Sequence, residues 1–402
     1  MNTSKNNAAG TNALSSRSAA AAPRGPLGVA RVSLQALGLL AALAGAGCAA
    51  DAAQGDAESL LLEEETDESE LALSDSLADR VKIITGATDE REGWARNATG
   101  GASGAVYHVK NLFDSGEGSL REALEKPEPQ WIIFDVSGTI ELQRTVDVKS
   151  HKTVDGRGKQ IVIKTNDEDT TAFRIENQQN TILLNLEFDN DWLAFDTDPT
   201  PEGADAIYIM DSHDIWIHHC EFLQWKDGAI DVKENTSADD NHNVSVTWSR
   251  FRKIYQAMLW EGDQLSLGHN VCSAQVNARC PKIVGGKAHS YNNYIAYWGG
   301  AAIQHADSGG QLYSQRNMFE SGDNKKVNVR DNPTTDKIEL DDNHPFNTVD
   351  FQGASDPVDS TFKAQSQSNA KLDVCSTSSC WTALKNRLLN GDAVHAAAGH
   401  SL

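Results

Sequence analysis

The chain has 402 residues, of which 39% are hydrophobic, so it is long enough for one large domain or two ordinary ones with a substantial core. Its 57 acidic and 35 basic residues give a formal net charge of −22. Binding of nucleic acid needs Lys and Arg to meet phosphates, so this composition argues against a nucleic-acid partner. The same charge repels any polyanion, which would need a bridging cation or a local basic stripe.

Residues 1–48 have the features of an export signal. They contain four basic and no acidic residues, and the apolar run at 32–46 is shorter than a membrane span of ~20 residues. The run ends at Cys48 in a sequence similar to a bacterial lipoprotein cleavage box. Lipid anchoring through Cys48 and ordinary signal cleavage nearby are both compatible with it. We therefore expect a secreted or cell-surface protein.

Residues 49–80 contain eleven acidic residues and one basic residue, Arg80. A segment with so much charge of one sign has little apolar surface to bury, so we expect it to be disordered. It could tether a domain to an anchor or act as a generic linker. Residues 81–402 carry about −16 and form the predicted folded domain.

From residue 81 onward, short apolar strands alternate with turns, as at 106–109, 131–134 and 161–163. A helix predicted at 119–125 interrupts them. It starts with Ser119 as N-cap and could cap the end of the fold.

A weak internal repeat follows this helix. The stretches 180–188, 214–222 and 243–251 each begin with Asn or Asp, continue as an alternating strand and end in Phe. Looser echoes end at Tyr294 and Phe319. An irregular repeat nearly free of helix predicts the stacked coils of a parallel β-helix. The alternative, a β-sandwich with coincidental similarity, is disfavoured because the register recurs three times.

The C-terminal part is predicted to hold long surface loops at 332–369 and a helix at 381–389 that packs on the coils. Two pairs of cysteines, Cys272/Cys280 and Cys375/Cys380, are close enough in sequence for small-loop disulfides in an oxidising compartment. Cys220 lies in an alternating apolar run and is predicted to be a buried thiol.

Many segments, in one order, resemble the pectate lyase superfamily over roughly residues 85–325. The segments that carry the resemblance are 92–101, 106–109, 111–121, 134–140, 153–158, 204–207, 215–220, 227–231 and 279–289, with Asn292-Asn293 behind them. The resemblance implies an all-β fold, a right-handed parallel β-helix with a short N-terminal capping helix. It also implies a lyase that cleaves 1,4-linked polygalacturonate by β-elimination and binds pectic polysaccharide.

Such a reaction removes the weakly acidic proton at C5 of a uronate, and a divalent cation on the neighbouring carboxylate stabilises the transition state. Calcium prefers oxygen ligands, mostly carboxylates. By resemblance, Asp205, Asp227 and Asp231 match calcium-binding positions, so we expect Ca²⁺ as cofactor. The even separation of Asp227 and Asp231 puts both on one face of a strand. A fourth acidic ligand of the family falls at Gly203, beside Glu202, which could replace it.

The alternative for these aspartates is a turn cap or a solvated face. Arg279, in the stretch Arg279-Cys280-Pro281, matches the position of the family's proposed base. A guanidinium is normally always protonated, so this role requires nearby cations that disfavour its charge. The alternatives are an arginine that binds a uronate carboxylate bidentately, or a purely structural one.

Two cationic residues that grip substrate carboxylates in the family are replaced here, a Lys by Gln256 and an Arg by Val284. We expect the nearby lysines Lys233, Lys253, Lys282 and Lys287 to compensate in part. The predicted substrate-binding residues are Lys233, Lys253, Gln256, Pro281 and Lys282. The leading hypothesis is thus a monomeric, calcium-dependent pectate lyase-like enzyme. The alternatives are a calcium-independent pectin lyase acting on esterified chains and a non-catalytic, glycan-binding β-helix.

Other side chains are assigned structural roles, with one exception. Trp260, beside Glu261, is the tryptophan that we expect at the cleft. The predicted packing residues are His218, His219 and His289, and the predicted internal asparagine ladder is Asn185, Asn243 and Asn292.

Overall fold

The computed structural model describes residues 91–190, 203–225, 227–234, 242–273, 275–322, 324–351 and 356–390, all within the compact unit Glu65–Leu402. The predicted export signal with Cys48, the tether at 49–80 and Glu202 lie outside the described residues. Within the described part of the chain, no helix has the length and apolar character needed to span a membrane.

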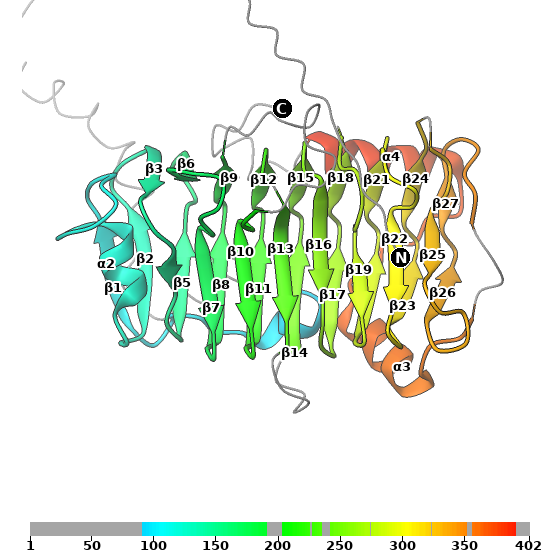
Figure 1. The fold of residues 1–402 in the computed structure, drawn as a ribbon, viewed down its shortest axis with the longest axis horizontal. Helices are drawn as coiled ribbons and strands as arrows, with labels where there is room; N and C mark the ends of the chain where they lie inside the picture. The colour runs from blue at the N-terminus through cyan, green and yellow to red at the C-terminus, as the bar shows by residue number, and fades with distance from the viewer. Residues whose placement is uncertain are drawn as a thin grey trace, which may run out of the picture. The chain divides into compact units, whose positions relative to one another are not determined.

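The described residues form coils whose strands build three parallel sheets (Figure 1). Sheet A consists of β1 (Ala105–Val109), β2 (Gln130–Phe134), β5 (Lys152–Asp155), β8 (Gln179–Leu184), β11 (His213–His218), β14 (His242–Thr247), β17 (Leu265–Gly268), β20 (Lys287–Tyr291), β23 (Gln311–Gln315) and β26 (Lys337–Asp341). Sheet B consists of β3 (Gly138–Leu142), β6 (Ile161–Thr165), β9 (Glu187–Asp189), β12 (Glu221–Leu223), β15 (Arg250–Arg252), β18 (Val271–Ser273), β21 (Tyr294–Ala296), β24 (Met318–Glu320) and β27 (His344–Pro345). Sheet C consists of β4 (Val146–Asp147), β7 (Phe173–Glu176), β10 (Ile207–Met210), β13 (Gly228–Lys233), β16 (Gln256–Trp260), β19 (Lys282–Val284), β22 (Gln304–Asp307) and β25 (Asn328–Arg330).

From β2 onward the chain visits the sheets in the order A, B, C, and each strand pairs with the equivalent strand of the next coil. The predicted parallel β-helix is therefore confirmed. A sheet edge remains only at the first and last coils, because every inner strand has a parallel neighbour on both sides.

A single residue in the left-handed backbone conformation makes the corner between sheets A and B in successive coils. These corner residues are Asn185, His219, Trp248, His269, Asn292, Arg316 and Asp342. Asn, Asp and His tolerate this conformation better than most residues, which helps to explain part of the set. The repeat seen in the sequence is thus one strand of sheet A, a two-residue corner whose first residue is left-handed, and one strand of sheet B.

The Phe that ends each repeat points into the core. Phe188 and Phe222 stack with ring centroids 5.1 Å apart, and Phe222 and Phe251 stack at the same distance. All three are fully buried. The repeat is confirmed to recur once in each coil of the solenoid, and its final aromatic residue is part of an internal stack.

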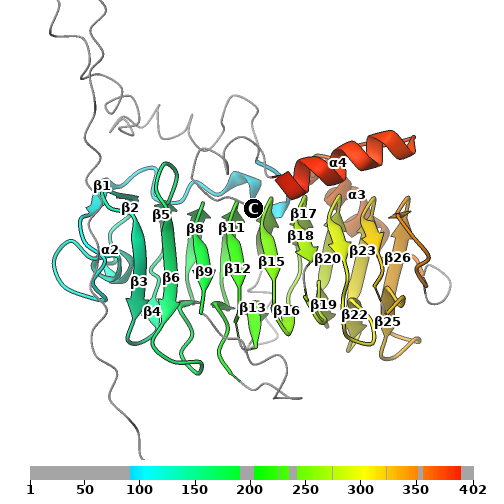
Figure 2. The same ribbon diagram turned by 90° about the horizontal axis from the view of Figure 1, so that it is seen from above.

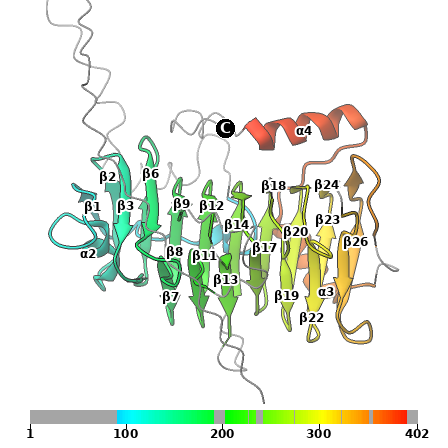
Figure 3. The same cartoon turned by 45° about the horizontal axis from the view of Figure 1, so that its top comes forward.

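The helices lie outside this core. α2 (Leu120–Glu125) has Ser119 as its N-cap, as predicted, and buries Leu120 and Leu124 in the main core beside the first coils. α4 (Ser378–Asn390) includes the helix predicted at 381–389, and it packs Trp381, Leu384 and Leu388 against Val271, Tyr294 and Met318 of sheet B (Figures 2 and 3). The remaining helices are η1 (Trp94–Asn97) and α3 (Ser360–Asn369).

Three predictions are wrong. The stretch 332–369 is not made only of loops, because it contains β26, β27 and α3. Trp260 is fully buried, and its indole N–H donates to the Ile230 carbonyl at 3.2 Å, so it is a core residue. The asparagine ladder runs through other residues, namely Asn270, Asn293, Asn317 and Asn343.

The predictions for the cysteines are confirmed. Cys272 is bonded to Cys280 and Cys375 to Cys380, while Cys220 is a buried free thiol. His218, His219 and His289 are buried, in agreement with packing roles.

Candidate functional site

Most of the predicted site residues lie on or beside the outward face of sheet C. In β13, Ile230 and Val232 belong to the core, so Asp231 and Lys233 alternate with them and face outward. Asp231 is in register with Leu259 of β16, which is in register with Lys282 of β19. Because strands of a sheet are about 4.8 Å apart, Asp231 and Lys282 are separated by roughly 10 Å along this row.

Asp205 and Asp231 meet around Gly228, which starts β13. A Cβ added at Gly228 would lie 2.4 Å from Asp205 Oδ1 and 3.1 Å from Asp231 Oδ1. One carboxylate oxygen of Asp205 and one of Asp231 therefore border the same small space above Gly228. The position requires glycine because the space that a methyl group would need is taken by a carboxylate.

The two carboxyl groups are almost completely buried, at 8% exposure each. Burial, together with the charges of Asp231 and Asp227, raises the pKa of Asp205 well above its ordinary value. Burial also raises the pKa of Asp231 to about 6, although Lys233, the Leu259 N–H and Arg279 oppose that rise. The N–H of Leu259 donates to Asp231 Oδ1 at 3.1 Å.

This pair of carboxylates fits a hard cation in its chemistry. Asp205 Oδ1 is buried and has no hydrogen-bond partner among the described residues, and a buried carboxylate oxygen without a donor is costly. Asp227 immediately precedes β13 and acts electrostatically on both groups. Among the described residues, however, no three His, Cys, Asp or Glu side chains converge as an assembled metal cluster.

Lys233 lies between two carboxylates of neighbouring coils. Its Nζ is 3.7 Å from Asp231 Oδ2 and 3.9 Å from Glu261 Oε1. Glu261 also accepts a hydrogen bond from the Glu234 N–H at 3.0 Å. Lys233 thus forms ion pairs with two carboxylates at or beside the predicted calcium site.

The other predicted substrate-binding residues lie in different surroundings. Lys282 is on the outward row but forms ion pairs with Asp307 at 2.9 Å and with Asp331 at 3.4 Å. Gln256 begins β16 in register with Gly228, and Pro281 is buried after a cis peptide bond. Lys253 is exposed at the corner where the chain leaves sheet B, three residues before β16.

Arg279 stands at the start of the next coil, two residues before Pro281. Its backbone is in the left-handed conformation, with φ 61°, and its carbonyl accepts a hydrogen bond from the Met258 N–H at 2.8 Å. The adjoining Cys280 is buried and bonded to Cys272, so the backbone beside Arg279 is held on both sides. The guanidinium is partly exposed and has neither a hydrogen bond nor an ion pair with any residue that the structure describes.

Three groups near these residues were not singled out from the sequence. Gly228 lies between the carboxylates of Asp205 and Asp231, and Glu261 forms an ion pair with Lys233. His305 of β22 is in register with Lys282 of the preceding coil. Burial lowers the pKa of His305, with Lys282 and Arg279 adding to that effect, which favours the neutral form of its imidazole. The coil register could have indicated Glu261 and His305, had the irregular repeat lengths allowed the coils to be aligned.

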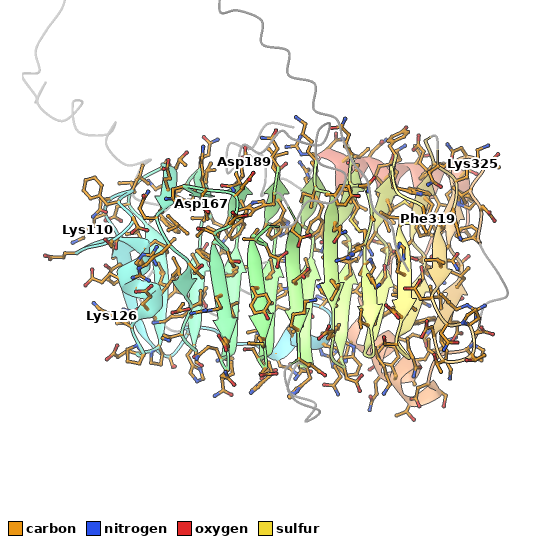
Figure 4. All side chains as sticks on the ribbon, viewed as in Figure 1. Lys110, Lys126, Asp167, Asp189, Phe319 and Lys325 are labelled. Carbon is orange, nitrogen blue, oxygen red and sulfur yellow. A yellow bond between two sulfur atoms is a disulfide. The ribbon has the colours of Figure 1, made fainter. Side chains whose placement is uncertain are left out.

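A cavity lies elsewhere in the fold, beside β1 and α2. It has a volume of about 750 Å³ and includes Tyr107, His108, Lys110 and Glu122 in its lining. Lys110 and Lys126 mark this end of the solenoid in Figure 4. Four polar side chains of its lining are bonded in two pairs, Tyr107–Glu122 and His108–Asp135.

Comparison with known sequences finds similarity over most of the chain. A family model described as pectate lyase matches residues 73–390. A pectate lyase of Nicotiana tabacum is 29% identical over 280 residues, which cover 61% of this chain and 66% of that protein. A probable pectate lyase, P56, of Solanum lycopersicum is 30% identical over 270 residues, covering 60% and 65%. The chain thus spans just under two thirds of the length of these relatives.

Solved structures share the fold at low sequence identity. Jun a 1, the major allergen from cedar pollen, superposes with a TM-score of 0.61 and 20% identity, covering 73% of this chain and 91% of that one. A pectate lyase bound to a hexasaccharide gives a TM-score of 0.57 at 16% identity, covering 75% and 96%. Both are similar to this chain in the course of the solenoid.

Proposed function

Because the chain belongs to the pectate lyase family, we propose that it is a polysaccharide lyase that cleaves 1,4-linked galacturonan by β-elimination on the outward face of sheet C. The observation that carries the proposal is that buried Asp205 and Asp231 lie together and that the charge of Arg279, two coils beyond β13, acts on Asp231. Both the acidic and the basic group of the predicted chemistry are thus available on one face.

In the proposed reaction the C5–H bond of a uronate gives its proton to a base, and its electrons form a C4=C5 double bond. The C4–O bond breaks, and its electron pair leaves on the departing oxygen, which takes up a proton. Arg279 is the proposed base. Its guanidinium forms no ion pair within the described residues, although the charge of Asp231 acts on it from a distance. A charged Arg279 would instead bind the uronate carboxylate.

The proposed cofactor is Ca²⁺, held by Asp205, Asp227 and Asp231. Support comes from the buried Asp205 oxygen that lacks a donor, and from the raised pKa of each buried carboxyl group, because a bound cation would favour the charged forms. When bound, such an ion withdraws charge from the substrate carboxylate and makes the C5 proton more acidic. Gly228 keeps the space between the carboxylates open.

The test is a lyase assay that follows the near-ultraviolet absorbance of the unsaturated product, with galacturonan and calcium. We expect Arg279→Lys to lower kcat by at least ~100-fold, because a misplaced ammonium cannot replace a positioned base. Arg316→Lys is the matched control, since Arg316 has a similar left-handed backbone, with φ 53°, at a corner of sheets A and B. Absence of product on every galacturonan tested would overturn the proposal.

A second candidate, a calcium-independent pectin lyase, is favoured by one observation: no three donor side chains converge in the described part of the chain. Activity that persists in excess chelator would select it. The third candidate, a non-catalytic glycan-binding protein, would bind galacturonan without forming product, and Arg279→Ala would leave that binding largely intact.

The proposed location is outside the cytoplasm, on the cell surface or in the medium. Two disulfides in the described part of the chain fit an oxidising compartment, which supports export through residues 1–48. Mass spectrometry of the mature N-terminus would distinguish a lipidated Cys48 from ordinary signal cleavage. Sedimentation would test the expected monomer.

A further inference from the structure

Most basic side chains on the strands of sheet C are neutralised by carboxylates of the same face. Lys282 is paired with Asp307 and Asp331, and Lys233 lies between Asp231 and Glu261. The pairs with Glu261, Asp307 and Asp331 connect different coils, so they are properties of the assembled face rather than of one strand.

The same holds toward both ends of the sheet. Arg174 of β7 is 2.6 Å from Asp147 and 3.6 Å from Glu176, and Arg330 of β25 is paired with Asp356. Each substrate carboxylate that approached one of these four cations would have to displace a carboxylate already present, or share the cation with it. Either event reduces the net attraction between the site and the substrate.

Arg279 and Lys326, which lie just before β19 and β25, form no ion pair within the described residues. Lys253 and Lys325, each three residues before a strand of sheet C, are exposed and likewise form no ion pair there, but they do not share the row of Arg279 and Lys326. Arg279 and Lys326 occupy one row, because Cys280 and Val327, which follow them, are both hydrogen-bonded to Ile303 of the coil between. Two coils separate them, which is roughly 10 Å. The coil between them has Ala302 in this row and therefore no charge.

At two further positions the face has neutral side chains. Gln256 begins β16 in register with Gly228, and Val284 ends β19 in register with Asp307. The face therefore offers free positive charge at isolated points, surrounded by carboxylates. A polymer with a carboxylate on every unit would meet repulsion along most of such a surface.

Resting on the proposed function, we infer that the substrate is partially methyl-esterified galacturonan, in which the carboxylates that meet Arg279 and Lys326 are free and most neighbouring units are neutral esters. Fully de-esterified chains are disfavoured by the carboxylates of the face. Fully esterified chains are disfavoured because they have no carboxylate for either cation.

The experiment compares initial rates on galacturonans that are fully de-esterified, sparsely, about half and fully methyl-esterified, at constant calcium and ionic strength. The expected optimum is at partial esterification, with a rate on the fully de-esterified chain roughly tenfold lower, the effect of one lost charged contact. A maximal rate on the fully de-esterified chain would overturn the inference and leave the proposed function standing. Failure to form product on any chain would overturn both.

Two variants test the electrostatic cause. Gln256→Lys combined with Val284→Arg adds two cations to the face and should move the optimum toward the de-esterified chain. Gln179→Lys, on an exposed position of β8 in sheet A, adds a charge away from the face and should leave the optimum unchanged. Lys326→Gln should raise KM for partially esterified chains while kcat stays similar. If the degree of esterification that gives the highest rate does not change when these two cations are added, the inference is contradicted.

Discussion

His269 and Glu92, 177 residues apart in sequence, are in direct contact inside the protein. Nδ1 of His269 lies 2.9 Å from Glu92 Oε1, and its Nε2 lies 3.1 Å from Asp373 Oδ2. The hydroxyl of Tyr291 also donates to Glu92, at 3.1 Å. One corner residue of the solenoid thus connects the segment before η1 with the segment before α4.

The stability of the protein should fall in alkaline solution because of this contact. Burial alone lowers the pKa of His269, but the charge of Glu92 and the hydrogen bonds to Asp373 and Glu92 raise it to about 9. Since the folded pKa lies above the unfolded value of about 6.5, the stabilisation is complete below pH ~6.5 and is lost as the pH rises through 9. We expect the free energy of unfolding to fall by on the order of 3 kcal/mol over this pH range, as measured by denaturant unfolding at several pH values.

His269→Asn should remove this alkaline decrease, and Asn tolerates the left-handed backbone at that corner. His289→Gln is the control, because burial lowers the pKa of His289 to about 3 and its imidazole does not titrate in the alkaline range. An alkaline decrease that persists unchanged in His269→Asn would contradict the assignment.

Gly228→Ala should weaken calcium binding and activity at least tenfold while the circular dichroism spectrum stays that of the wild type. The added Cβ would force Asp205 Oδ1, only 2.4 Å away, out of its position. Calorimetric titration with calcium measures the affinity. Gly322→Ala is the control, since its backbone is not in the left-handed region and the nearest atoms to a Cβ there are 3.6 Å away. Unchanged calcium affinity in Gly228→Ala would show that the carboxylates around it do not hold the ion.

Phe222→Ala should destabilise the protein by about 3–5 kcal/mol, because Phe222 is the middle rung of the buried phenylalanine stack. The decrease is measured as the change in the unfolding free energy in urea. Phe113→Ala, at a side chain that is 70% exposed, should change it by less than about 0.5 kcal/mol. Equal effects of the two substitutions on the free energy of unfolding would contradict the placement of Phe222 in the buried core.

Replacing both Cys272 and Cys280 by Ala should cost about 2.5 kcal/mol of stability, as expected for the loss of a crosslink that closes a short loop. The kcat of the folded variant should also fall, because Cys280 adjoins Arg279 and the lost disulfide no longer holds its backbone. Comparing kcat of this variant with that of Cys375→Ala/Cys380→Ala, whose disulfide lies beside α4, separates the two effects. A larger kcat loss in the second variant would contradict this role.

The folded architecture could be predicted because its signals are local. The repeat ending in Phe188, Phe222 and Phe251 reflects alternation within one strand and one corner, which a short window of sequence contains. The helix capped by Ser119 and the two disulfides are local in the same sense.

At Asn292 the predicted asparagine ladder is wrong by one position, for a geometric reason. Asn292 is a corner residue whose side chain bonds to Asp373, whereas the next residue, Asn293, points inward and bonds to Asn317. A corner in the left-handed conformation changes which of two adjacent residues faces the core. Only the backbone geometry of the corner distinguishes Asn292 from Asn293.

By itself, the sequence determined the parallel β-helix, its coils and the residue types available for lyase chemistry. Tertiary structure alone decided which charges are available to a substrate. The sequence predicted Lys282 and Lys233 as substrate-binding cations and Arg279 as the base. Both lysines are paired with carboxylates from other coils, whereas Arg279 has no such pair in the described residues. The physical reason is that ion pairs on this face join residues tens of positions apart, and their register depends on loops of irregular length.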